Sequence, residues 1–235
     1  MAIAAAAGAV ALMIVVGASS PKDAPIAIQL QAAGPVVATL PLKLPTGDAQ
    51  QVITIDAPNA TSTTATLRAW DRVPGGWVPM TPDELAHTAV GGLTQQPSEE
   101  VPATPVGSFT LTQAFGKLSD PGTTMPYFQV TPGDWWISQP GPLYNTHQLC
   151  TLACPFLMRS PNTHLMDTVR AYNYALVLDY NRFPVVQGAG SAYFLHVTTA
   201  GRPTKGCIGV AQPVMAGLLR WLLPSASPRI LIGVG

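Results

Sequence analysis

The sequence predicts a mostly β fold, that is, a β-rich α+β domain with one or two short helices. The 24 prolines and 21 glycines are spread along the chain, and such residues favour many short elements joined by tight turns over a helical bundle. Short runs of β-branched and aromatic residues recur from Gln51 onward, as expected for strands. One later segment has the spacing of apolar residues that is typical of a helix.

The first strands are expected in the N-terminal half of this domain. Val52–Ile55 and Thr64–Trp70 are rich in β-branched residues or alternate between polar and apolar ones, which favours extended structure. Pro74–Trp77 predicts a turn that ends in an aromatic residue. Gly107–Thr112 follows Pro105 and is expected to form a further strand.

Two neighbouring strands and a closing strand are expected nearer the C-terminus. Tyr174–Tyr180 and Ala192–Val197 are apolar and aromatic, and the glycines of Gly188–Gly190 predict a turn between them. Arg229–Ile232 predicts the closing strand.

One helix is expected between these strands. Gln212 and Pro213 are suited to its first turn, and Pro224 ends it. The apolar residues that fall on one stripe of this helix are Val214, Leu218, Trp221 and Leu222.

The composition fits one domain and excludes one class of partner. With 235 residues, 47% of them hydrophobic and 10% charged, the chain can bury a full core in a single domain, which is expected over residues 51–235. Residues 21–50 are rich in Ala and Pro and predict an irregular lead-in or linker. The net charge is zero and the Lys and Arg residues are scattered, so the sequence lacks the basic footprint of a nucleic-acid-binding protein.

The first 20 residues predict export. Ala2–Ala18 is apolar throughout, and its end, Val16–Ala18, offers the small residues that a signal peptidase requires. No Lys or Arg precedes the apolar run, and its length approaches that of a membrane span. Two interpretations of residues 1–20 therefore stay open, a signal peptide and an N-terminal membrane anchor. Both place the rest of the chain outside the cytoplasm, in the periplasm, in the cell wall or in the medium.

Cys150 and Cys154 are close enough in sequence to close a small disulfide loop, as exported proteins commonly do. Two alternatives stay open. Together with His147 and His164, the pair has the donor atoms of a zinc site, although the spacing departs from the usual finger and ribbon patterns. In the second alternative, both cysteines are ordinary buried thiols.

The third cysteine has the neighbours of a nucleophile. Cys207 follows Gly206 and lies eleven residues after His196, and a thiol nucleophile requires such a base within reach. His196 either takes the thiol proton or holds the pair as thiolate and imidazolium, which lowers the pKa of the cysteine. The N–H groups of Gly206 and Cys207 are candidate donors to an oxyanion. Lys205 adds positive charge beside the sulfur, and Arg202 is a candidate ligand for a substrate carboxylate.

The segments around this pair resemble the L,D-transpeptidase (YkuD-like) family. Gly190–His196 and Pro203–Ile208 are similar to its catalytic signature, in which a His on a strand precedes a Ser/Thr-x-Gly-Cys motif. Thr104–Phe109 resembles the family's Thr-Pro-x-Gly-x-Phe segment. The resemblance covers about residues 51–235 and extends, in the style of the actinobacterial branch, to Pro126-Tyr127, Asp134–Trp136, Leu143–Asn145 and Tyr180–Val185.

The resemblance implies a fold and a reaction. The fold is a β-sandwich with one or two short helices beside the catalytic cysteine. Cys207 attacks the carbonyl on the L side of an L,D peptide bond in a peptidoglycan tetrapeptide stem, so that a terminal D-amino acid leaves and a thioester forms. An amine of a neighbouring stem, typically that of diaminopimelate, then takes the acyl group. Water in the place of this amine makes the enzyme an L,D-carboxypeptidase.

The resemblance also implies roles for single residues. His196 is the general base and acid, and a nearby backbone carbonyl, that of Val197, orients its ring. No metal or organic cofactor is implied, and carbapenems are expected to acylate Cys207. The residues expected at the substrate or the oxyanion are Ser191, Arg202, Thr204, Lys205 and Gly206.

Three positions depart from the family's pattern. Lys205 stands where many members have a second His, Val197 where a small residue is more usual, and Gly209 where many have Arg or Asn. These departures keep open a cell-wall binding protein with weakened catalysis. An unrelated secreted cysteine hydrolase is a third interpretation, but the familiar cell-wall amidases place their Cys before their His. The residues expected either to line a peptide groove or to pack the domain's edge are Trp135, Trp136, Tyr144 and Asn145.

Overall fold

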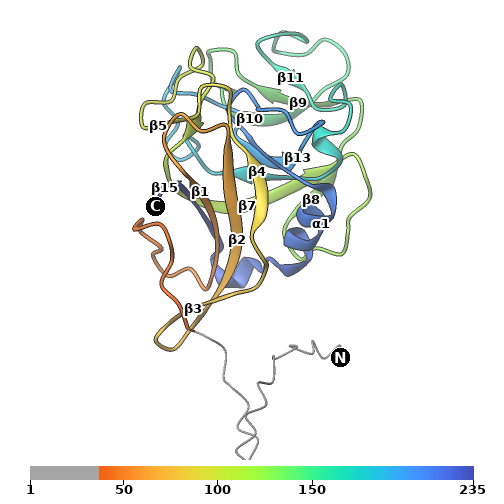
Figure 1. The fold of residues 1–235 in the computed structure, drawn as a ribbon. Coiled ribbons are helices and arrows are strands. Elements are labelled where there is room, and N and C mark those ends of the chain that lie inside the picture. The colour runs from red at the N-terminus through yellow and green to blue at the C-terminus, as the bar shows by residue number, and fades with distance from the viewer. Residues whose placement is uncertain (1–36) are drawn as a thin grey trace, which may run out of the picture.

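The computed structural model describes residues 37–235 (Figure 1). The predicted signal peptide or membrane anchor of residues 1–20 lies outside the described residues, as does the first part of the predicted lead-in. Among residues 37–235, no helix is long and apolar enough to cross a membrane. The described part is built mostly from β-strands, which confirms the predicted fold class.

The largest sheet closes on itself. Its first strand, β1 (Gln51–Ala57), pairs in parallel with β15 (Arg229–Val234) on one side and antiparallel with β2 (Thr64–Val73) on the other. The path from β15 back to β2 runs through β7 (Gly107–Gly116), β12 (Ala175–Leu178), β13 (Phe194–Val197), β14 (Ile208–Val210) and β4 (Glu84–His87), while β3 (Gly76–Pro79) pairs with β2 and β8 (Tyr127–Gln129) with β7.

One face of this sheet encloses the main apolar core. Ile53, Leu67, Leu195 and Ile230 are fully buried in it. The helix α1 (Gln212–Trp221) closes the core with buried apolar side chains of its own. Burying an aliphatic side chain of this size contributes about 1.5–3 kcal/mol, so each of these residues stabilises the fold substantially.

A smaller sheet covers the opposite face of β12 and β13. Trp136 in this small sheet packs edge-on against Phe194 of β13, with ring centroids 4.8 Å apart. Phe194 also packs against Phe115 and Tyr172, which makes an aromatic layer between the two sheets. The remaining elements are the small sheet's β10 (Thr146–Leu149), β9 (Asp134–Ile137) and β11 (Thr163–His164), the pair β5 (Leu93–Thr94) and β6 (Thr104–Pro105), and the short 3-10 helices Ala171–Asn173 and Pro224–Ala226.

The predicted strands are present, but some of them begin or end at other residues than predicted. The segment expected over Tyr174–Tyr180 is extended only over Ala175–Leu178. The segment expected over Ala192–Val197 pairs only from Phe194, because the backbone of Ala192 is left-handed, with a φ of 57°. This early end matters for the site, as shown below.

The folded body begins before Gln51. Leu42 and Ala49, which fall within the predicted lead-in, are buried against Trp70 and Trp77. Residues 37–50 are irregular in backbone, as expected, but they are packed on the outer face of the large sheet rather than separate from it.

Candidate active site

The sheet register brings His196 and Cys207 to the same face. β13 and β14 are parallel neighbours, with Leu195 opposite Ile208 and His196 opposite Gly209. Cys207 directly precedes β14, so continuing the register places it beside Phe194, two positions from His196 on the neighbouring strand. Residues two apart on a strand share a face. The register therefore brings the two side chains together although eleven residues separate them in sequence.

Both side chains line one cavity of about 530 Å³. The cavity lies at the border between the aromatic layer and the loop that follows β13. Its wall contains the expected substrate residues Ser191, Arg202, Thr204, Lys205 and Gly206, and also Glu99, Tyr172, Ala192 and Tyr193.

The imidazole of His196 is fixed in one orientation. The side chain is buried, with 7% of the residue exposed, and its Nδ1 lies 2.8 Å from the carbonyl oxygen of Val197. A carbonyl only accepts, so Nδ1 carries the proton and the lone pair is on Nε2. Burial lowers the pKa of His196 below its ordinary value, and the bond to Val197 opposes this only in part. The resting imidazole is neutral and basic at Nε2.

The thiol of Cys207 is neutral at rest. Its Sγ donates to the carbonyl oxygen of Ala192 at 3.3 Å, and the residue packs against the aromatic layer. Burial raises the pKa of the thiol to about 12, and a backbone hydrogen bond from Phe194 opposes this only partly. Among the described residues, no hydrogen bond joins Cys207 and His196. Of the two expected resting states, the structure therefore favours the neutral pair over thiolate and imidazolium.

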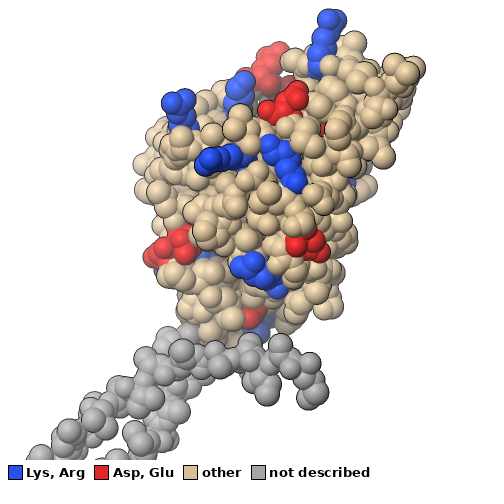
Figure 2. Space-filling view, turned by 90° about the vertical axis from the view of Figure 1, so that its right-hand side faces the viewer, with Lys and Arg blue, Asp and Glu red and all other residues tan. Residues whose placement is uncertain are grey.

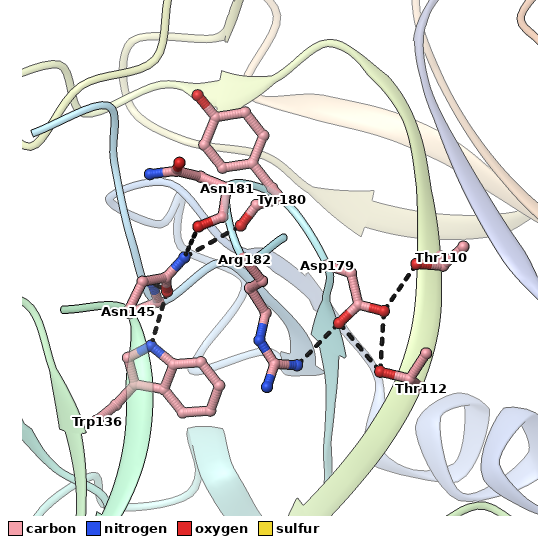
Figure 3. A network of polar contacts seen from close by, with 9 residues as sticks. Thr110, Thr112, Trp136, Asn145, Asp179, Tyr180, Asn181 and Arg182 are labelled. Carbon is pink, nitrogen blue, oxygen red and sulfur yellow. Dashed lines mark hydrogen bonds and ion pairs between the residues drawn. The ribbon is translucent and has the colours of Figure 1, made fainter. Parts of the chain in front are cut away.

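A buried amide, that of Asn145, holds the backbone N–H of Ala192, the residue whose carbonyl accepts from the thiol. Asn145 is 3% exposed, and its Oδ1 accepts from the N–H of Ala192 at 3.1 Å and from Nε1 of Trp136 at 3.0 Å. Its Nδ2 donates to the carbonyl oxygens of Tyr180 and Asn181, at 3.1 and 2.8 Å (Figure 3). All hydrogen-bonding groups of this amide are thus satisfied. The amide is fixed in the position from which it restrains the left-handed backbone of Ala192 beside Cys207.

The same close-up shows how the neighbouring loop is secured. Asp179 accepts from Thr110, Thr112 and Arg182, with the Arg182 contact at 2.8 Å (Figure 3). Arg182 also lies over the ring of Trp136. These contacts anchor the loop whose carbonyls receive the Asn145 amide.

The turn before Cys207 is built differently from what the sequence suggests. The Gly206 N–H donates to Oγ1 of Thr204 at 3.2 Å, so it is not the free oxyanion donor that we expected. Thr204 in turn donates to the Cys207 carbonyl oxygen at 2.6 Å. Gly206 is required because a Cβ there would lie 2.7 Å from the ring of Tyr193. The Cys207 N–H remains as the oxyanion candidate.

Comparison with protein-family models identifies the family of the chain. The model of the YkuD family, described as the L,D-transpeptidase catalytic domain, matches residues 62–231. The chain belongs to the L,D-transpeptidase family. No curated protein and no solved structure matches the chain. Family membership supports an activity of the L,D-transpeptidase type on peptidoglycan, and the match covers both His196 and Cys207.

The positions where this chain departs from the pattern of its family are placed as follows. Val197 is buried in the main core and offers only its carbonyl to His196, so its side chain does not affect the imidazole. Gly209 is buried opposite His196, and a Cβ there would lie 3.2 Å from Cα of Thr198. Lys205 is exposed and lines the cavity together with Arg202.

Ser191 supports the cavity wall. Its Oγ donates to Oγ of Ser138 at 2.7 Å, which links the segment before β13 to the small sheet. It stands directly before Ala192, so this bond adds to the restraint that Asn145 places on the same backbone.

The other two cysteines form a disulfide, the pairing that the first sequence interpretation gives. Their sulfurs are therefore not available to zinc. The histidines of the zinc alternative are also occupied: His147 Nε2 contacts Asp134 at 2.6 Å, and His164 contacts Pro132 and Asp167. Residues 37–235 contain no cluster of side chains suited to a metal ion.

The four residues expected at a groove or at the domain's edge are packed inside. Trp135, Trp136, Tyr144 and Asn145 are 1–5% exposed, so they support the site from behind rather than line a groove. The sequence offered one signal for Asn145, its place after Tyr144 in a family segment. It offered none for its partner Ala192, because alanine seldom adopts a left-handed backbone.

Proposed function

We propose that this L,D-transpeptidase is an exported cysteine acyltransferase that acts on peptidoglycan stem peptides through a thioester on Cys207. The observation that carries the proposal is the placement of Cys207 beside His196, on one face of parallel strands and in one cavity. The fixed Nδ1 proton of His196, with the lone pair on Nε2, is what a general base for a neutral thiol requires.

Acylation follows from the neutral pair. The S–H bond turns from the Ala192 carbonyl towards Nε2 of His196, which takes the proton while the sulfur bonds to the substrate's carbonyl carbon. The carbonyl oxygen becomes an oxyanion, for which the Cys207 N–H is the candidate donor. When this intermediate collapses, the C–N bond breaks, and the imidazolium returns its proton to the leaving amine. The D-amino acid departs and the thioester remains.

Deacylation repeats these steps with a new nucleophile. An amine of a second stem peptide attacks the thioester carbonyl, His196 takes one of its protons, and the thiol is released in its protonated form. Water at the same place gives the carboxypeptidase reaction. Arg202 and Lys205, both at the cavity's exposed loop, are suited to bind a carboxylate of the stem.

Export completes the proposal. The substrate lies outside the cytoplasm, and the apolar run in residues 1–20 provides a signal peptide or a membrane tether. The disulfide between Cys150 and Cys154 supports an oxidising compartment.

One observation favours the alternative of a cell-wall binding protein with weakened catalysis. The thiol is held on the Ala192 carbonyl, and its raised pKa leaves very little thiolate at neutral pH. If the S–H bond does not turn to His196 when substrate binds, the stem peptide binds without turnover.

A carbapenem and a muropeptide test these possibilities. In the wild type, mass spectrometry should show a carbapenem adduct that Cys207→Ala abolishes, and an adduct that survives this substitution contradicts the proposal. Incubation with purified tetrapeptide muropeptides should release D-alanine, with dimers for transpeptidation or tripeptides alone for hydrolysis. Binding with no released D-alanine identifies the alternative. N-terminal sequencing of protein from the culture medium tests export, which an intact Met1 in a cytosolic fraction would contradict.

A further inference from the structure

The active-site cavity contains one carboxylate that the catalytic mechanism does not use. Glu99 lines the cavity with its neighbours Ser98 and Val101, in a segment that is distant in sequence from the strands of the site. The other charged side chains of the lining are Arg202 and Lys205. The cavity therefore presents charges of both signs around the thiol of Cys207.

Glu99 is held in place although it is exposed. The hydroxyl of Tyr144, a residue only 1% exposed, donates to its Oε1. The N–H of Glu99 donates to the carbonyl oxygen of Gly188 at 3.3 Å, in the loop that leads to Ser191. These two contacts tie the carboxylate to the same wall that carries Ser191 and Ala192.

The position of Glu99 is close to the catalytic pair. Tyr193 packs its ring against Gly206, next to Cys207. Burial is the main cause that raises the pKa of Tyr193, and its ionisable neighbours Tyr180, Cys207 and Glu99 raise it further. Tyr193 is thus close enough to interact electrostatically with both Cys207 and the carboxylate of Glu99.

None of these three charged side chains forms an ion pair within the described part of the chain. The ion pairs among residues 37–235 join Arg68 to Asp83, His147 to Asp134, His164 to Asp167 and Arg182 to Asp179. Glu99, Arg202 and Lys205 take part in none of them. Figure 2 shows that charged side chains of both signs are spread over a mostly uncharged face of the molecule.

We propose that Glu99 binds the side-chain ammonium group of a peptidoglycan stem peptide in the cavity, with Tyr144 fixing the carboxylate. This inference rests on the proposed function for the identity of the peptide. A stem peptide carries both a free side-chain amine and carboxylates. Its ammonium group can pair with Glu99, and its carboxylates can pair with Arg202 and Lys205. The ammonium could belong to the acyl donor or to the acceptor, and the experiment separates the two.

The competing role of Glu99 is to satisfy the buried Tyr144 hydroxyl. Glu99→Gln separates the roles, because an amide oxygen still accepts from Tyr144 while the negative charge is lost. Glu100→Gln is the matched control, since Glu100 is the adjacent exposed acid and does not line the cavity.

Binding is measured first without catalysis, in a Cys207→Ala background. The ligand is a synthetic stem tetrapeptide with a free side-chain amine, compared with the same peptide acetylated on that amine. We expect Glu99→Gln to weaken binding of the free-amine peptide about fivefold, an effect that shrinks as salt is raised. Glu100→Gln should leave it unchanged, and neither variant should alter binding of the acetylated peptide. Equal affinities for the free-amine peptide in Glu99→Gln and Glu100→Gln overturn the proposal.

Turnover in the presence of Cys207 then identifies the source of the ammonium. A raised KM for the tetrapeptide in Glu99→Gln assigns it to the donor, and a raised KM for the amine assigns it to the acceptor. If the wild-type protein releases no D-alanine, the proposed function is contradicted. The role of Glu99 is still decided by the binding experiment, which does not depend on turnover.

Discussion

His196 and Arg202 line the same cavity but belong to walls of different kinds. The strand wall, which contains Ala192, His196 and Cys207, is backed by the aromatic layer and by the fully bonded amide of Asn145. The loop wall, residues 198–205, carries the exposed cations Arg202 and Lys205. Burial on the strand wall fixes orientation and shifts pKa values, whereas exposure on the loop wall leaves charges free to meet a ligand. We therefore expect substitutions in the strand wall to change kcat and those in the loop wall to change KM.

The largest effect is expected at the base of the strand wall. His196→Ala removes the group that we propose takes the thiol proton, and general acid–base catalysis of this kind contributes on the order of a thousandfold. The kcat for D-alanine release should fall by that factor, with little change in KM. Arg202→Ala is the control from the loop wall, for which KM should rise instead. Equal effects of both substitutions on kcat would contradict the distinction between the walls.

The pH dependence should show a neutral catalytic pair. The active form needs neutral His196, whose pKa is lowered below 6.5, so activity should rise with pH through a midpoint below 6.5 and then stay level. The thiol pKa is raised from 9.0 to about 12. Alkylation by iodoacetamide requires the thiolate, so its rate should keep rising above pH 9. An alkylation rate that is already level at pH 7 would instead indicate a thiolate–imidazolium pair.

The amide behind the strand wall should affect both stability and the thiol. Asn145→Ala leaves the N–H groups of Ala192 and Trp136 without their acceptor, which should cost about 2–3 kcal/mol of unfolding free energy. Once Ala192 is released, its carbonyl no longer holds the thiol, so the pKa of Cys207 should fall and alkylation at pH 8 should speed up.

Asn162→Ala is the matched control for this prediction. Asn162 is a buried amide that bonds to Ser138, Gln139 and Leu157 instead. A similar loss of stability is expected in urea denaturation, with a much smaller change in alkylation, because Asn162 reaches Ala192 only indirectly, through Ser138 and Ser191. If Asn145→Ala alters alkylation no more than Asn162→Ala, the amide only stabilises the fold.

A smaller effect on kcat is expected at Thr204, which lies in the loop wall but bonds to the backbone of Cys207 in the strand wall. Thr204→Val keeps the shape but removes the bonds to the Cys207 carbonyl and the Gly206 N–H. The loss should be about 1 kcal/mol of stability, with a decrease in kcat of a few-fold, because the N–H of Cys207 is less well fixed. Thr204→Ser should restore both quantities. A Ser variant no better than Val would show that packing and not hydrogen bonding is what Thr204 supplies.

The smallest effect on activity is expected at the disulfide. Replacing Cys150 and Cys154 by Ser opens a loop with a sequence separation of 4, which should cost about 2 kcal/mol of unfolding free energy. The kcat should not change, because neither residue lines the cavity. A fall in kcat together with normal stability would link this loop to the active site.

Much of the fold was predictable because local pattern and tertiary structure agree there. β1, β2 and β15 have β-branched runs, and α1 has an apolar stripe and a proline in its first turn. Short strands such as β4 and β9 were not predicted. Four residues carry too little periodicity, and pairing with neighbouring strands decides their structure.

Of the candidate site, the sequence predicted mainly the reactive pair and the glycine beside it. Cys207, Gly206 and His196 stand in a motif whose chemistry constrains spacing, and register places the His and the Cys on one face. Glu99 and Asn145 reach the site from distant parts of the chain, so no local pattern marked Glu99, and the family segment that contains Asn145 did not reveal its bond to Ala192. The actual reason for Gly206, the ring of Tyr193 against it, is likewise a tertiary contact.

The sequence by itself predicted the longer strands, the helix after Cys207 and the candidate base and nucleophile, and it gave the disulfide as one of three interpretations of Cys150 and Cys154, since these depend on local propensity and on motif spacing. Only the tertiary structure decided that the large sheet closes through β1 and β2, that the resting thiol is neutral and held by Ala192, and that a carboxylate shares the cavity. The reason is that burial and hydrogen bonding between distant segments set pKa values and orientations, and neither is encoded within a few neighbouring residues.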